Sequence, residues 1–266
     1  IANVYYPEQE MTVALVINPI DTNVDRRPSD LKDKPYDDPE VIGRYIDLLD
    51  YVYEEIPNLQ LSYLSIGNEI DGTLGENADL WTEYIHFFEE TSTHARSLWP
   101  DVPVGSKVMY GGAMGQASTS VRTLNQHCDV VMITYYPIDS RYQVKNPDDI
   151  QGDIQALLEI FAGQTVYLAE AGYPSSDANG SSVNAQAEFV HQMFKIWDKH
   201  ADQIKLISFA FQTEHSSETV SDLTDYYGAS NKAFAEFLRS LGMRTPDGQD
   251  KPAWLQLEAE AEARGW

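Results

Sequence analysis

Six short apolar segments, each followed by a segment with helical spacing, restrict the fold of this chain more than any other feature. Strands are predicted near Thr12 to Asn18, Leu61 to Asn68, Val102 to Val108, Val130 to Tyr135, Thr165 to Ala169 and Ile204 to Ala210. Helices are predicted at Pro39 to Ile56, Asn77 to Leu98, Gly115 to Gln126, Pro147 to Phe161, Val183 to Ala201, Ala229 to Leu241 and Pro252 to Ala263. Strands that alternate with helices indicate an α/β protein with a parallel sheet.

Two α/β architectures fit this alternation: a doubly wound sheet and a barrel of eight strand-helix units. The nearest candidate for a phosphate-binding loop, Gly111 to Gly115, has neither the dinucleotide nor the Walker spacing. We therefore expect a TIM-type β/α barrel. Because about six units can be counted, and the chain starts at Ile1 without a leader, we expect an incomplete barrel that lacks the first two strands. An irregular architecture is the alternative.

Composition restricts the number of domains and the partners. With 266 residues, 42% hydrophobic content and no Ser/Gly-rich linker, residues 1–266 are predicted to form one domain with a short helical tail at about 252–266. The formal charge of −24 repels phosphate backbones and anionic membranes, so we expect neither as a partner. There is also no apolar stretch of membrane-spanning length. The compartment stays open, with a secreted or periplasmic location favoured.

Cysteine and histidine usage gives no sign of a metal or cofactor. Cys128 is the single cysteine, and only His86 and His94 share a predicted helical face. We expect no metal site and no cofactor. The sequence also has no Gly-x-Ser-x-Gly motif, which argues against an esterase.

Two glutamates stand at the ends of predicted strands. The segment Leu61 to Asn68 leads to Glu69, and Thr165 to Ala169 leads to Glu170; both are followed by turn-forming residues. A carboxylate at this position lies at the rim of a sheet, where a ligand reaches it. Hydrolysis of a glycosidic bond uses two carboxyl groups, one as acid and the other as nucleophile or base. A glycosidase is therefore the first hypothesis.

The residues around these glutamates resemble a known family. The motifs are Gly67-Asn68-Glu69, Tyr135-Tyr136-Pro137 and the segment Ala169-Glu170-Ala171-Gly172-Tyr173-Pro174-Ser175. Together they resemble clan A, the retaining glycoside hydrolases with (β/α)8 barrels. The third motif is similar to the endo-galactanase and β-1,3-glucanase branches.

This resemblance implies roles for several residues. Glu69 would be the general acid/base and Glu170 the nucleophile, while Asn68 would hydrogen-bond the sugar 2-hydroxyl. Tyr135 or Tyr136 would orient Glu170, and strand alternation allows only one of them to face the barrel axis. Which of the two does so stays open at this stage.

Tyr135 and Tyr136 are also sugar-binding candidates, because their rings could stack on a sugar face. Further candidates follow the last two strands: Tyr173, Phe211, Glu214 and His215. Phe211 stands where members of the family usually have a tryptophan under the reactive sugar. The expected substrate is a β-linked oligosaccharide or polysaccharide, with galactan and β-1,3- or β-1,4-glucan suggested by the resemblance. A transglycosylase and a non-catalytic carbohydrate-binding barrel are the alternatives. An open barrel would expose strand edges, so we also expect a homo-oligomer that closes them.

Overall fold

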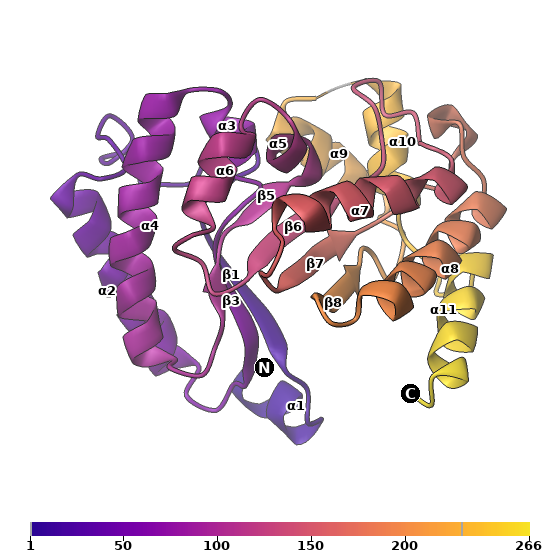
Figure 1. The fold of residues 1–266 in the computed structure, drawn as a ribbon, viewed down its shortest axis with the longest axis horizontal. Coiled ribbons are helices and arrows are strands. Elements are labelled where there is room, and N and C mark those ends of the chain that lie inside the picture. Colours follow the sequence, from indigo (N-terminus) through magenta and orange to yellow (C-terminus); the bar gives the residue numbers. More distant parts are fainter. Residues whose placement is uncertain (1, 230) are drawn as a thin grey trace. The chain divides into compact units, whose positions relative to one another are not determined.

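The computed structural model describes residues 2–229 and 231–266, so Ile1 and Ser230 lie outside the described part of the chain. The chain divides into two compact units, Ile1–Ile133 and Thr134–Trp266 (Figure 1). Each unit is described by itself. One domain over residues 1–266 stays a prediction.

The first unit is built on a sheet with the strand order β2-β1-β3-β4. The strands of this sheet are β1 (Val13–Asp21), β2 (Val24–Asp25), β3 (Leu61–Asn68) and β4 (Val104–Gly105). The unit also contains β5 (Lys107–Met109), which is not part of this sheet. β1 is parallel to β3, with Leu15 opposite Leu64, and β3 is parallel to β4. β2 pairs with β1 only at Ile20 and Asp21. A homo-oligomer that covers open strand edges stays a prediction.

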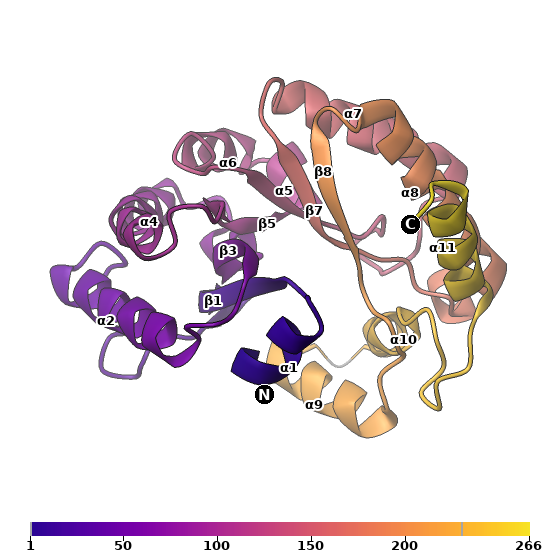
Figure 2. The same cartoon turned by 90° about the horizontal axis from the view of Figure 1, so that it is seen from below.

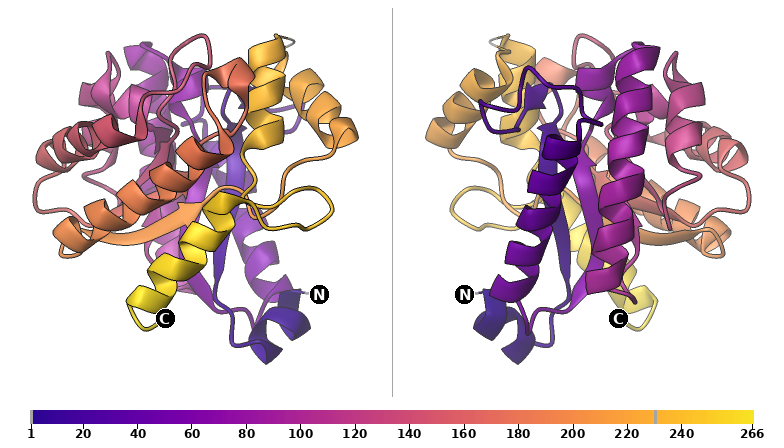
Figure 3. Two further views of the ribbon diagram at one scale, coloured as in Figure 1. Left: turned by 90° about the vertical axis from the view of Figure 1, so that its right-hand side faces the viewer. Right: turned by 90° about the vertical axis from the view of Figure 1, so that its left-hand side faces the viewer.

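The helices of this unit are α1 (Ala2–Glu8), α2 (Pro39–Glu55), α3 (Asp71–Leu74), α4 (Ala78–Leu98), α5 (Tyr110–Met114) and α6 (Ser118–Leu124). α2 begins with Pro39 after the N-cap Asp38, whose side chain accepts a hydrogen bond from the Glu40 amide. α2 and α4 lie side by side (Figure 3). The phenol hydroxyl of Tyr45 donates to the carbonyl of Ile17, and that of Tyr84 to Ile66, which ties both helices to the strands.

The second unit contains the end of β6 (Val131–Tyr135), which crosses the boundary, followed by β7 (Val166–Ala171) and β8 (Ile204–Phe209). β7 and β8 are parallel neighbours, with Leu168 opposite Ile207 (Figure 2). The helices are η1 (Pro147–Asp149), α7 (Ile150–Ile160), η2 (Asp177–Asn179), α8 (Val183–His200), α9 (Ser217–Tyr227), α10 (Lys232–Ser240) and α11 (Pro252–Ala263).

The last helix, α11, packs along α8 in this unit (Figure 3). Val190, Phe194, Met243 and Ala253 form a buried apolar cluster between these segments. Arg264, directly after α11, forms ion pairs with Asp198 of α8 and with Glu260. The C-terminal segment is therefore an integral part of the core of this unit.

Each of the six segments predicted as strands contains a strand, and each of the seven segments predicted as helices contains a helix. The helices α1, α3, α5 and α9 were not predicted. α9 has few apolar residues, and only Val220 among them is buried, so it lacks the spacing that identifies a helix. No helix in the described ranges combines the length and the apolar character needed to span a bilayer.

The core of the first unit provides a test of the fold. Leu49 of α2 has no exposed area, whereas its neighbour Leu48 is 41% exposed. We expect Leu49→Ala to lower the free energy of unfolding by about 2–5 kcal/mol, because it leaves a cavity. The matched Leu48→Ala change should cost less than about 1 kcal/mol. Urea denaturation of both variants measures this difference, and equal losses would contradict the assignment of the buried face.

Candidate functional site

The end of β3 places Glu69 at a sharp turn in the first unit. Gly67 and Glu69 both have positive φ, at 86° and 46°. A Cβ atom at Gly67 would lie 2.6 Å from the hydroxyl oxygen of Tyr84 and 2.5 Å from the Cγ2 atom of Ile70. Only glycine fits here, and the left-handed conformation of Glu69 is rare for a residue with a side chain. Backbone outliers of this kind are concentrated at functional sites.

The end of the neighbouring strand supports this turn. Thr22 follows β1; its amide donates to the carbonyl of Asn68 at 2.8 Å, and its hydroxyl donates to the Glu69 carboxylate, also at 2.8 Å. Thr22 therefore fixes both the main chain and the carboxyl group of the predicted acid/base. The sequence analysis missed Thr22. Its position directly after a strand that pairs with β3 is the signal that could have identified it.

Asn68 has one half of its amide group fixed and the other half without a partner. Its Nδ2 donates to a carboxylate oxygen of Asp21 at 2.9 Å. Its Oδ1 is buried and has no hydrogen-bond partner among the described residues. A buried acceptor without a donor is uncommon and costs free energy, so it fits a site that is completed by a ligand hydroxyl. The role of Asn68 in sugar binding stays a prediction.

Asp71, two residues after Glu69, has a strongly perturbed carboxyl group. It is 7% exposed and accepts a hydrogen bond from the Met109 amide at 2.8 Å. The pKa of Asp71 is raised to about 7: burial is the largest cause, the nearby charge of Glu69 also raises the pKa, and the hydrogen bond from the Met109 amide lowers it. A Cβ atom at Gly112 would lie 2.1 Å from Asp71 Oδ2, so the backbone closes directly over this carboxyl group.

In the second unit, Glu170 lies near the end of β7 and is held by Tyr136. The Tyr136 hydroxyl donates to Glu170 Oε2 at 2.9 Å. A Cβ atom at Gly172 would lie 2.5 Å from the Tyr136 ring and 2.7 Å from the carbonyl oxygen of Ala210. Glycine at this position therefore lets the ring lie against the end of β7. Of the two tyrosines left open by the sequence, Tyr136 is the one that contacts Glu170.

Tyr135 and Tyr173 were predicted to bind sugar, and the structure corrects both expectations. Tyr135 has no exposed area, and its hydroxyl donates to Asp153 of α7 at 2.9 Å. Tyr173 is 2% exposed, stacks on Phe189 and donates to the carbonyl of Lys145 at 2.8 Å. Because successive strand residues point to opposite faces, Tyr135 faces the helices while Tyr136 faces Glu170.

The segment after β8 contains the remaining candidates. Phe211 is 37% exposed, and its ring centre lies 4.7 Å from that of His215, with an angle of 52° between the planes. Partial burial lowers the pKa of His215. Both rings remain sugar-binding candidates. Glu214 is paired with Lys251, whose Nζ lies 2.8 Å from Glu214 Oε1, so its carboxylate makes an internal contact. A sugar-binding role for Glu214 stays a prediction.

A carboxyl group with a raised pKa makes stability depend on pH. The pKa of Asp71 in the folded protein is about 7 rather than 3.8. The contribution of this carboxyl group to the free energy of unfolding is therefore fully present below pH 4 and is lost as the pH rises to 7. We expect Asp71→Asn to remove this loss, so that the variant gains about 1.4 kcal/mol relative to the wild type per pH unit in that window. Urea denaturation at pH 4 and pH 8 measures this change.

The matched control for this prediction is Asp101→Asn, which changes an exposed carboxylate in the same unit. Its stability relative to the wild type should be the same at pH 4 and pH 8. A constant difference for Asp71→Asn as well would contradict the raised pKa.

Comparisons with known proteins give a result for structure but not for sequence. No model of a protein family matches the sequence, and no curated protein matches it either. Among solved structures, a GH5_18 protein from Bifidobacterium longum subsp. longum in complex with Manb1-4GlcNAc matches with a TM-score of 0.72 and 16% identity, over 97% of this chain and 62% of that chain.

Two further solved structures have the same kind of fold. The GH53 catalytic domain of Ignisphaera aggregans matches with a TM-score of 0.70 and 14% identity, over 96% of this chain and 75% of that chain. A β-glucuronidase from an uncultured Clostridium sp. matches with a TM-score of 0.65 and 15% identity, over 97% of this chain and 41% of that chain. This chain thus spans from 41% to 62% of the length of the first structures that it matches.

At these identities, the comparisons establish likeness of fold. The described residues contain six strand-helix units, two fewer than a full eight-fold barrel. The absence of the family's first two strands stays a prediction. The chain has a TIM-type β/α-barrel fold like that of these glycoside hydrolase structures, represented by about six units.

Proposed function

We propose that this chain carries the catalytic carboxylates of a retaining β-glycoside hydrolase. The observation that supports this most directly is the setting of the two glutamates. Glu69 follows β3 and accepts a hydrogen bond from Thr22, and Glu170 lies near the end of β7 and accepts one from Tyr136. In open and closed parallel sheets, catalytic groups are placed at the carboxyl ends of the strands. The fold shared with glycoside hydrolases makes sugar chemistry the best-supported reaction.

The proposed reaction has two displacements at one anomeric carbon. Glu170 attacks this carbon, the glycosidic C–O bond breaks, and protonated Glu69 gives its proton to the leaving oxygen. In the second step Glu69 takes a proton from water, whose oxygen attacks the anomeric carbon and breaks the ester bond to Glu170. This mechanism requires the two carboxyl groups to be about 5–5.5 Å apart in the active enzyme.

The neighbouring side chains have roles that follow from their contacts. The hydroxyl groups of Thr22 and Tyr136 limit the positions of the two carboxyl groups, which is the usual means of reaching an attack geometry. The unpartnered Oδ1 of Asn68 can accept a hydrogen bond from a sugar hydroxyl. The half-exposed ring of Phe211, with His215 beside it, offers an apolar surface for a sugar face.

The proposed substrate is a β-linked oligosaccharide or polysaccharide. Two of the structural neighbours involve β linkages: one is a β-glucuronidase, and the other is in complex with Manb1-4GlcNAc. Galactan and β-glucan remain the candidates suggested by the sequence motifs. Transfer to a sugar instead of water would make the same site a transglycosylase.

Variants of the two glutamates test the roles assigned to them. On 2,4-dinitrophenyl β-glycosides, whose leaving group needs no acid, Glu69→Ala should form the glycosyl-enzyme but hydrolyse it slowly. Glu170→Ala should lose at least about a thousandfold in kcat, because it removes the nucleophile. Azide should rescue both variants, giving an α-glycosyl azide with Glu170→Ala and a β-glycosyl azide with Glu69→Ala. NMR of the products distinguishes the two anomers.

The control is Glu159→Ala, which removes an exposed glutamate of α7 and should leave kcat unchanged. A kcat of Glu170→Ala equal to that of the wild type would exclude the proposed mechanism. Sugar binding without turnover by the wild type would instead favour a carbohydrate-binding barrel.

The adjacent tyrosines provide a second test. Tyr136→Phe keeps the ring beside Gly172 but removes the hydrogen bond to Glu170, so kcat should fall about ten- to a hundredfold. Tyr135→Phe removes an equivalent hydroxyl that bonds Asp153, so it should cost about 1 kcal/mol of stability and leave kcat unchanged. Steady-state kinetics and urea denaturation of both variants measure this. Similar kinetic losses in the two variants would contradict the assignment of Tyr136.

A further inference from the structure

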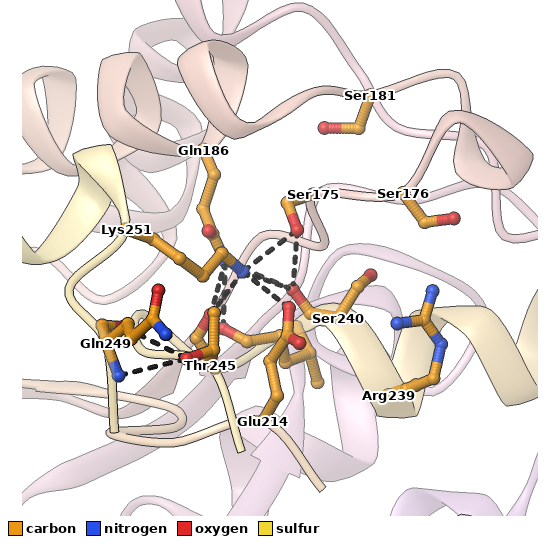
Figure 4. Close-up of polar contacts among 12 residues, drawn as sticks. Ser175, Ser176, Ser181, Gln186, Glu214, Arg239, Ser240, Thr245, Gln249 and Lys251 are labelled. Atoms are coloured by element: carbon orange, nitrogen blue, oxygen red, sulfur yellow. Dashed lines mark hydrogen bonds and ion pairs between the residues drawn. The ribbon is translucent and has the colours of Figure 1, made fainter. Parts of the chain in front are cut away.

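A buried lysine lies at the centre of a polar cluster in the second unit (Figure 4). Lys251 precedes α11 and is 6% exposed. Its Nζ lies 2.8 Å from Glu214 Oε1 and 2.9 Å from Ser175 Oγ, and it also donates to the main-chain carbonyls of Ser240 and Gly242. Lys251 therefore connects the segment after β7, the segment after β8 and the turn after α10. A buried ammonium group needs such acceptors to offset its lost hydration.

A second buried side chain holds the same turn from α8. Gln186 is 2% exposed, and its Nε2 lies 2.8 Å from the carbonyl oxygen of Tyr173 and 2.9 Å from that of Leu241. The turn is also crowded against the β8 segment: a Cβ atom at Gly242 would lie 2.0 Å from the Glu214 amide nitrogen. The turn at residues 240–242 is thus fixed by side chains that come from two helical segments and by direct backbone contact.

This fixed turn leads into a segment that is hydrogen-bonded to the main chain of Phe211 and its neighbours. The Met243 amide donates to the Phe211 carbonyl and the Arg244 amide to the Gln212 carbonyl, both at 2.9 Å. In return, the Glu214 amide donates to the Arg244 carbonyl at 2.9 Å. The amide of Lys251 itself donates to the Met243 carbonyl at 3.1 Å. The position of Phe211 is therefore coupled to Lys251 through both main-chain and side-chain contacts.

We propose that Lys251 is a positioning residue for the sugar-stacking surface made by Phe211 and His215. By pairing with Glu214 and holding the turn at Gly242, Lys251 keeps residues 211–215 against residues 242–244, so that the Phe211 ring is presented in one orientation. This inference rests on the proposed sugar-hydrolysing function for its effect on substrate, whereas the coupling itself can be measured without turnover. Neither Lys251 nor Gln186 is marked by a sequence motif, because their partners are mostly main-chain carbonyls.

The kinetic test compares Lys251→Met with Phe211→Ala on an aryl β-glycoside. Each change should raise KM about tenfold and leave kcat within about twofold, because a stacking surface contributes to binding rather than to proton transfer. The double variant should have a KM no higher than that of Phe211→Ala alone, since Lys251 acts through Phe211. Additive effects on KM, or an unchanged KM in Lys251→Met, would overturn the proposal.

Two further variants separate positioning from stability. Arg264→Met removes the ion pair from the end of α11 to Asp198 of α8, together with the pair to Glu260 within α11, so it should lower the melting temperature but leave KM unchanged. Lys251→Met combined with Glu214→Leu leaves no unpaired charge in the interior, so the melting temperature should recover from that of Lys251→Met. Its KM should stay raised, because the contacts to Ser175 and to the turn are still missing. Recovery of KM together with stability would overturn the positioning role.

Hydrogen exchange tests the coupling independently of catalysis. In Lys251→Met, the amides of Met243, Arg244 and Glu214 should exchange at least about tenfold faster than in the wild type. If Lys251→Met does not fold, the variant that combines it with Glu214→Leu takes its place. Arg264→Met should not change their exchange. Unchanged exchange would overturn the inference even in an active enzyme. If the wild-type protein has no hydrolytic activity but these amides still exchange faster in Lys251→Met, the coupling is supported and only the proposed function fails.

Discussion

Parallel strand pairing is the constraint on which the candidate site depends. Because β1 and β3 run in the same direction, their carboxyl ends meet at one edge of the sheet, and Thr22 can bind both the main chain and the carboxyl group that follow β3. β7 and β8 are parallel in the same way in the second unit. Each glutamate is thereby placed where a strand stops and side chains of the neighbouring segment can reach it.

Close packing of the backbone is the second condition for these contacts. A methyl group at Gly67 would overlap Tyr84, which lies directly behind the site. A methyl group at Gly172 would overlap Tyr136, which the site uses. Tyr84 could not reach the carbonyl of Ile66 past a side chain at residue 67, and Tyr136 could not lie against the end of β7 past one at residue 172. The tyrosine hydroxyls and the glycines are therefore parts of one arrangement in each unit.

The sequence predicted the regular elements well because their apolar spacing is a local property. The strand that ends at Asn68 and the long helix α4 follow directly from such spacing, whereas α9 does not, since only Val220 of that helix is buried. The tyrosine pair shows a different limit. Alternation indicates that Tyr135 and Tyr136 face opposite sides, but only their contacts with the carboxylates of α7 and β7 reveal which side each one faces. Thr22 and Lys251 act through residues distant in sequence, and no local pattern indicates such contacts.

The attachment of the C-terminal segment to the loop after β8 has a consequence for protein engineering. Loops at the carboxyl ends of barrel strands are natural places for exchange between related scaffolds, because they carry specificity while the sheet carries the fold. In this chain, however, residues 211–215 share their hydrogen bonds with residues 242–244 and their charge with Lys251. An exchange of residues 211–215 would therefore have to include residues 242–251 as well. The smallest exchangeable module here consists of two segments that are separated along the chain.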